Sequence, residues 1–122
     1  MYARPYRDNQ RELTTLMYVV IVGCSESGYH LSKALIAGGH EVVVIEKNEG
    51  RFQLLNEELG SVALLGDGTD EITLKRAGIS RADVVVSLTG ADATNLVVSQ
   101  MTKHMFKVPR TMALIKDPKN EP

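Results

Sequence analysis

From Tyr18 onward, short runs of β-branched and aliphatic residues alternate with segments whose apolar residues recur at helical spacing. Continuous apolar runs of this length are typical of strands that are covered on both faces, because neither face meets water. Their alternation with helical segments predicts parallel strands joined by crossover helices. The predicted strands are YVVIVG (18–23), EVVVIE (41–46), SVALLG (61–66), ADVVVSL (82–88) and TMALI (111–115).

Capping residues and glycines mark where the predicted helices begin and end. The first helix covers residues 28–37, and Asn48 is placed to cap the second. Either Thr69 or Asp70 caps the third, and the fourth covers residues 92–106. Together these elements predict an α/β fold, a Rossmann-like doubly wound parallel sheet of about five strands with helices on both faces.

The chain has 122 residues, the length of one domain. We expect a flexible N-terminal extension over residues 1–16, one domain over 17–118 and a tail over 119–122. The helix and sixth strand that complete a full doubly wound sheet are missing after the fifth predicted strand. The domain is therefore either minimal or part of a longer protein, and the sequence leaves both open.

Charge, cysteine and hydropathy exclude several classes of partner. The chain has 14 Lys and Arg against 15 Asp and Glu and no basic block, so nucleic acid is not an expected partner. One cysteine excludes an internal disulfide, and three scattered histidines predict no metal site. The longest apolar stretch, residues 16–24, is shorter than the about 20 residues that cross a bilayer, so direct membrane insertion is not expected. A reducing cytoplasm fits these features best.

The segment IVGCSESG (21–28) follows the first predicted strand and nearly matches the dinucleotide-binding pattern G-x-G-x-x-G. Gly23 permits a tight turn, and Gly28 lets the next helix pack closely on the sheet. Backbone N–H groups and a helix N-terminus lie between them, which predicts an anion site. Ser25 stands at the position of the middle glycine, and Glu26 follows it.

Three further strand ends carry suitable chemistry. Glu46 ends the second strand 18 residues after the glycine loop, where the pattern places an acid that accepts hydrogen bonds from ribose hydroxyls and repels a 2′-phosphate. The third strand ends in GDGT (66–69), where Asp67 is a candidate acceptor for the exocyclic amine of adenine, and the fourth ends in LTG (88–90). Carboxyl ends of parallel strands meet at one edge of the sheet, so the coincidence predicts an adenine-nucleotide site.

Four segments resemble, in this order and spacing, the N-terminal nucleotide-binding domain of the TrkA family, also called the RCK or KTN domain: YVVIVGCSESG, EVVVIEKN, GDGTDEITLKRAGISRADVVVSLTGADATNL and VPRTMALIKDP. The resemblance covers nearly all of residues 17–118 and is most specific over 66–95, where a GD turn precedes a T-x-x-D-x-T-N rim. Members of the family are cytoplasmic regulatory domains of potassium channels and transporters. They bind NAD(H), ATP, ADP or AMP and assemble as dimers or larger rings.

The resemblance implies a regulatory protein that is not an enzyme, with a membrane potassium channel or transporter as partner. It further implies a homodimer or higher homo-oligomer, placed in the cytoplasm or against the inner membrane through that partner. By the same resemblance, Glu46 is the ribose acid, Asp67 and Gly68 contact adenine, and Thr89 belongs to the rim on the phosphate side. The ligand contacts expected on these grounds are Gly23, Cys24, Ser25, Glu26, Ser27, Gly28, Glu46, Lys47, Asp67, Gly68, Thr69, Leu88 and Thr89.

Two residues depart from the family pattern GCGRxG, namely Ser25 for the middle glycine and Glu26 for the arginine that reaches the outer phosphates. Two like charges about 5 Å apart at an effective dielectric of about 20 repel by about 3 kcal/mol, less with salt and side-chain rotation. Three explanations of Glu26 stay open: it turns into solvent, it biases the site toward AMP or NAD(H) over ATP, or nucleotide binding is lost.

Two other functions are open besides a nucleotide sensor. An interaction scaffold with a degenerate pocket would keep the fold without the ligand. A nicotinamide-dependent oxidoreductase has less support, because no residues remain after the fifth strand to build a substrate domain. Cys24 lies beside a helix start, which lowers thiol pKa values, but a small buried hydrophobe is the commoner role of such a residue.

Overall fold

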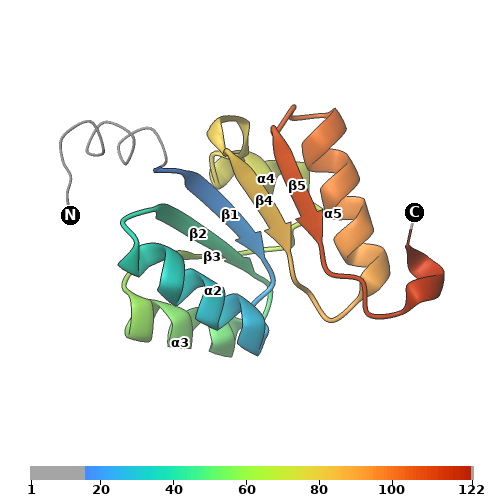
Figure 1. Ribbon diagram of the computed structural model, residues 1–122. Helices are drawn as coiled ribbons and strands as arrows, with labels where there is room; N and C mark the ends of the chain where they lie inside the picture. Colours follow the sequence, from blue (N-terminus) through green and yellow to red (C-terminus); the bar gives the residue numbers. More distant parts are fainter. Residues whose placement is uncertain (1–15, 122) are drawn as a thin grey trace, which may run out of the picture.

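The computed structural model describes residues 16–121, in which all five strands run parallel. The strand order is β3-β2-β1-β4-β5, so the order reverses between β1 and β4 (Figure 1). This confirms the predicted Rossmann-like fold class. The strands are β1 (Tyr18–Val22), β2 (Glu41–Glu46), β3 (Ala63–Leu65), β4 (Val84–Ser87) and β5 (Arg110–Ala113).

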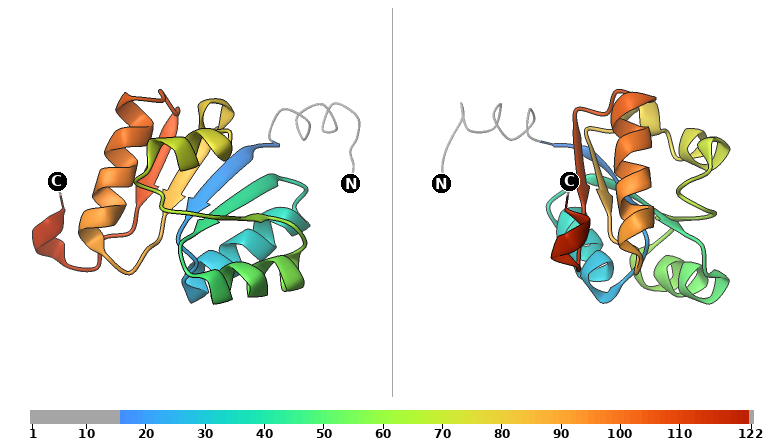
Figure 2. Two further views of the ribbon diagram at one scale, coloured as in Figure 1. Left: turned by 180° about the vertical axis from the view of Figure 1, so that it is seen from behind. Right: turned by 90° about the vertical axis from the view of Figure 1, so that its right-hand side faces the viewer.

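Helices cover both faces of this sheet. Connections between parallel strands are right-handed as a rule, and the chain moves from β1 toward one edge through β2 and β3 and then toward the other edge through β4 and β5. The helices of the two halves therefore lie on opposite faces. The two hydrophobic clusters place α2 and α3 on one face and α4 and α5 on the other. Figure 2 shows the sheet from behind, with α4 in front of it. The helices are α2 (Glu26–Ala37), α3 (Glu49–Leu59), α4 (Glu71–Arg76) and α5 (Asp92–His104), with short 3-10 helices η1 (Ile79–Arg81) and η2 (Pro118–Asn120).

The residues of β1 are all buried and divide between two hydrophobic clusters. Val19 and Ile21 pack with Leu55 of α3 on one face. Val20 packs with Leu74 of α4 on the other face. This strand therefore requires a continuous apolar run, since the side chains on each of its two faces pack into a hydrophobic core.

Side-chain caps fix the starts of the helices. Asn48 caps α3, because its Oδ1 accepts the Arg51 N–H at 2.9 Å. Of the two candidates for α4, the structure selects Asp70, which accepts the Ile72 N–H. Ser25 caps α2, which begins at Glu26, two residues earlier than the sequence predicts.

The two ends of the chain differ in what the structure describes. The predicted N-terminal extension lies outside the described residues except for Leu16, which is exposed. At the other end, Asp92 accepts hydrogen bonds from the backbone of Lys116 and Asp117 and from the Asn120 side chain, which attaches η2 to the start of α5. Within residues 16–121, no helix has the length and apolar character needed to cross a bilayer.

Candidate functional site

A cleft of about 470 Å³ opens at the carboxyl edge of the sheet, beside the point where the strand order reverses. This is the place where open α/β sheets bind ligands, and the volume lies in the range of small-molecule pockets, about 300–1,000 Å³. Of the predicted contact residues, the cleft brings together Gly23, Cys24, Ser25, Glu46, Lys47, Asp67, Gly68, Leu88 and Thr89. Four others do not line it: Glu26, Ser27, Gly28 and Thr69.

The turn after β1 requires glycine at both of its ends. Gly23 has φ of +91°, and a Cβ there would lie 2.9 Å from the Thr89 backbone. A Cβ on Gly28 would lie 2.9 Å from the carbonyl oxygen of Gly23, so the first turn of α2 packs directly on the loop. The middle position has a different use here, because the Ser25 hydroxyl accepts the Gly28 N–H at 3.3 Å. This cap leaves the helix N-terminus beside the cleft, where it favours an anion.

Glu46 is buried at the end of β2, with 4% of its surface exposed, and it still lines the cleft. Its Oε1 accepts the Cys24 N–H at 2.8 Å, and its Oε2 accepts the Asn48 N–H at 2.6 Å. The carboxylate therefore holds the loop after β1 and the loop after β2 in one arrangement. Each carboxylate oxygen can accept a second hydrogen bond, so the side chain can still accept one from a ligand hydroxyl.

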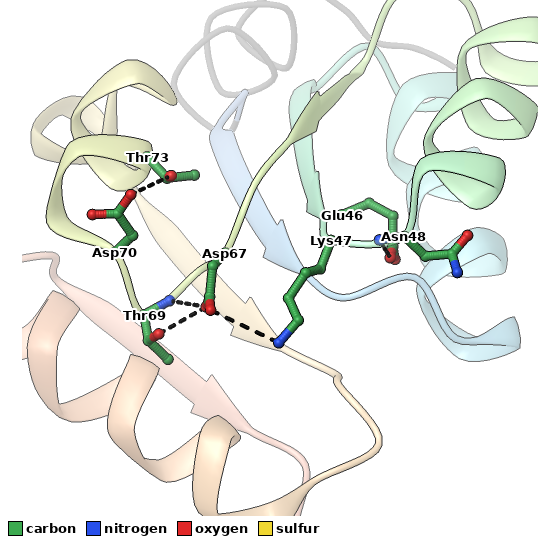
Figure 3. Close-up of polar contacts among 7 residues, drawn as sticks. All are labelled: Glu46, Lys47, Asn48, Asp67, Thr69, Asp70 and Thr73. Atoms are coloured by element: carbon green, nitrogen blue, oxygen red, sulfur yellow. Dashed lines mark hydrogen bonds and ion pairs between the residues drawn. The ribbon is translucent and has the colours of Figure 1, made fainter.

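Asp67, at the end of β3, faces the end of β2 across the cleft (Figure 3). Its Oδ1 accepts the backbone N–H of Thr69 at 2.9 Å and the Thr69 hydroxyl at 2.7 Å. Its Oδ2 lies 3.8 Å from the Lys47 ammonium. The hydrogen bonds from Thr69 hold the pKa of the Asp67 carboxyl below its usual value, and Lys47 adds to this effect. Asp67 is thus a charged acceptor at neutral pH, and Thr69 orients it from outside the cleft.

Gly68 follows Asp67 and lies against β1. A Cβ at this position would overlap the Val22 side chain, so the turn can approach the strand this closely only with glycine at position 68. The close approach brings the turn into the wall of the cleft, which Gly66, Asp67 and Gly68 line.

Asn95 is fully buried in α5 and holds the loop after β4, the rim of the cleft. Its Oδ1 accepts the Thr89 N–H at 2.9 Å, the Thr89 hydroxyl at 2.6 Å and the Ser87 hydroxyl at 2.9 Å. Its Nδ2 donates to the carbonyl oxygens of Thr89 and Leu114. The last residue of the T-x-x-D-x-T-N segment is therefore a support of the rim.

Glu26 is exposed at the first residue of α2 and lines a second hollow, of about 310 Å³, between α2 and α3. Apolar side chains, among them Leu54 and Leu55, make up most of this hollow, and Glu58 lies on its wall. The carboxylate of Glu26 therefore stands beside the main cleft rather than inside it.

Arg51 is the charged residue of the cleft that sequence reasoning missed. It lines both the main cleft and the second hollow, and Cys24 and Ser25 do the same. The available signal was its place three residues after the Asn48 cap, because side chains in a first helical turn lean toward the N-terminus of the helix.

Cys24 is half-buried in the wall of the cleft. Burial raises the pKa of its thiol and the Glu46 carboxylate raises it further, while Arg51 acts in the opposite direction. The thiol pKa is therefore raised and not lowered, so Cys24 is not an activated thiol.

This predicts slow alkylation of Cys24. The rate of reaction with iodoacetamide should reach half of its limiting value at a higher pH in the folded protein than in the same protein unfolded in urea, because only the thiolate reacts. The chain has a single cysteine, so the unfolded protein is its own control. An equal or lower midpoint in the folded protein would contradict the burial argument.

Comparison with known proteins relates this arrangement to a family. Residues 19–122 match the sequence model of the TrkA-N domain. A Trk system potassium uptake protein TrkA homolog from Methanothermobacter thermautotrophicus is 38% identical over 105 residues, which cover 86% of this chain and 48% of the relative. The Trk system potassium uptake protein TrkA from Streptomyces coelicolor is 34% identical over 103 residues, 84% of this chain and 46% of the relative. The chain thus spans about half the length of these relatives.

A solved structure agrees in fold. The domain described as the NAD(P)-binding domain of an exopolyphosphatase-related protein from Archaeoglobus fulgidus superposes with a TM-score of 0.75. It is 23% identical, and the match covers 86% of this chain and 77% of that one. At this identity the similarity supports the fold alone.

Proposed function

Because the chain belongs to the TrkA-N domain family, we propose that it is a nucleotide-sensing regulatory domain that controls a potassium channel or transporter. The observation that carries the proposal is the buried Glu46 carboxylate in the wall of the cleft, which is hydrogen-bonded to the backbone of the glycine loop after β1. Its relatives named as Trk potassium uptake proteins support the transport role, and the cytoplasm is the proposed location.

We propose AMP or NAD(H) as the favoured ligand, with ADP next and ATP weakest. Glu46 would accept the ribose hydroxyls, Asp67 the exocyclic amine of adenine, and the loop from Gly23 to Ser25 would face the phosphate. The cleft fits this assignment, because carboxylate acceptors follow two strands and the N-terminus of α2 lies at the end of a third. The carboxylate of Glu26 beside the loop would repel each further phosphate.

Regulation would follow from a shift of population between two assembly states. A ligand can shift such an equilibrium only by its different affinity for the two states. Asn95, which supports the rim, also donates a hydrogen bond to the carbonyl oxygen of Leu114, directly after β5. A ligand that moved the rim would therefore also act on the edge strand of the sheet. Val97, Met105 and Met112 are exposed apolar residues of α5, its C-terminal end and β5, and they support a homodimer or higher homo-oligomer.

The alternatives are a scaffold that has lost its ligand and, with less support, a small oxidoreductase. Titration calorimetry with AMP, ADP, ATP, NAD⁺ and NADH separates the sensor from the scaffold. Ligand at 100 times its dissociation constant should also stabilise the fold by about 2.7 kcal/mol in a thermal shift. No binding by any of the five would favour the scaffold, and sustained turnover of NADH with a carbonyl substrate would favour the enzyme.

Replacing Glu26 with arginine is expected to raise the affinity for ATP by about tenfold and to change the affinity for adenosine little. The substitution removes a repulsive charge and adds an attractive one at a solvent-exposed position, so the fold should be retained. Calorimetry with ATP and adenosine measures the effect. An ATP affinity that stays the same, or that is already the tightest in the unchanged protein, would defeat the charge argument.

A further inference from the structure

The cleft holds two cationic side chains among the residues that line it, Lys47 and Arg51. Lys47 lies at ion-pair distance from Asp67, toward the end of β3. Arg51 makes no ion pair within 4.0 Å with another of the described residues 16–121. Among the described residues it is therefore the cation of this cleft that no carboxylate contacts at ion-pair distance.

The position of Arg51 aims it at the carboxyl edge of the sheet. Its backbone N–H donates to the Asn48 cap, which places it in the first turn of α3. Helical side chains lean toward the N-terminus of their helix, and the N-terminus of α3 directly follows the end of β2. The side chain consequently reaches the wall that Cys24 and Ser25 form on the other side of the same opening.

The loop itself brings no positive side chain to a phosphate. Cys24, Ser25 and Ser27 are neutral, and Glu26 is an exposed carboxylate that lines the second hollow. Backbone N–H groups and the start of α2 supply only partial charge. A phosphate placed there still lacks a full countercharge from its own loop.

We propose that Arg51 binds the phosphate of the nucleotide from α3, across the opening, and so replaces the cation that the loop lacks. The inference deepens the proposed function and rests on it. A guanidinium suits this role, because its planar N–H groups bind a phosphate in a bidentate manner that a point charge does not match. One cation on α3 and one carboxylate at the start of α2 together favour a ligand with few phosphate charges.

The test compares AMP with adenosine, which differ only in the phosphate. In calorimetry, Arg51→Ala should weaken AMP binding by about tenfold or more and leave adenosine binding within about twofold. Arg51→Lys should lie between, since it keeps the charge and loses the bidentate geometry. Arg76→Ala is the matched control, because Arg76 is an exposed arginine at the end of α4 that does not line the cleft.

The outcomes separate the inference from the function on which it rests. Equal AMP affinities of Arg51→Ala and Arg76→Ala, with the unchanged protein still binding AMP, would overturn the role of Arg51 alone. An equal loss of AMP and adenosine would also overturn it, because the residue would then not act on the phosphate. Absence of any binding to the unchanged protein would instead overturn the proposed function. A salt dependence of AMP affinity that is weaker in Arg51→Ala than in Arg76→Ala is the second expected result.

Discussion

Replacing Gly23 with alanine is expected to destabilise the fold by about 3 kcal/mol and to lower Tm by more than about 10 °C. Two costs add at this residue. Its φ of +91° is a conformation that a residue with a Cβ adopts only with strain. The new Cβ would also lie 2.8 Å from the Thr89 methyl and 2.9 Å from the Thr89 backbone, and a backbone cannot move aside as a flexible side chain can.

Two control variants separate these costs. Gly60 has a similar φ of +82° with no atom within 4 Å of the added Cβ, so Gly60→Ala measures the strain alone. Gly90 also has open space around the added Cβ and no positive φ, so Gly90→Ala should change Tm little. Thermal unfolding of the three variants gives the comparison. If Gly23→Ala lost no more stability than Gly60→Ala, the close approach of the loop to the rim would be wrong.

Asn95→Ala is expected to cost about 3 kcal/mol or more, and to reduce affinity for AMP at the same time. The side chain is fully buried, and its removal leaves the hydroxyl of Ser87, the N–H of Thr89 and the carbonyl oxygen of Leu114 without this partner. Each buried group that loses its partner costs about 1–3 kcal/mol. Chemical denaturation gives the loss of stability, and calorimetry gives the loss of affinity.

An isosteric variant and a neighbouring one check this prediction. Asn95→Asp keeps the shape but sets an oxygen against the carbonyl oxygens of Thr89 and Leu114, so it should also destabilise. Ser99→Ala removes one part-buried hydroxyl contact, to Thr111, from the same helix and should cost about 1 kcal/mol or less. Equal effects of Asn95→Ala and Ser99→Ala would show that the rim does not depend on this network.

The strand pattern could be predicted because its physical cause is local. β1 must be apolar throughout, since Val19 and Val20 face different cores, and a short continuous apolar run is typical of a strand that is covered on both faces. The lengths of the strands were harder to predict from the sequence. β3 is three residues long against a predicted six, and its last residue, Leu65, is exposed at the edge of the sheet.

The start of α2 could not be predicted from the glycine pattern. That pattern describes a loop as far as Gly28, but the Ser25 hydroxyl caps the helix and starts it at Glu26. This difference of two residues moves Glu26 from the phosphate loop onto the first helical turn, beside the cleft.

Part of the candidate site could be predicted from the sequence, because the carboxyl ends of parallel strands lie at one edge of the sheet. Residues next to those ends, such as Glu46 and Asp67, could be predicted from their place after each strand. Asn95 could be placed at the rim, but its hydrogen bonds and the position of Arg51 could not be predicted, because they depend on how α5 and α3 pack. Spacing along the chain gives no distance between α3 and the loop after β1.

In the proposed sensor, the cleft holds an adenosine phosphate with its ribose on Glu46. A crystal structure of the protein grown with saturating AMP tests this most directly. We expect AMP at the carboxyl edge, with a ribose hydroxyl within hydrogen-bond distance of the Glu46 carboxylate and the phosphate facing the turn after β1. A cleft without AMP, or AMP bound with its ribose away from Glu46, would contradict it.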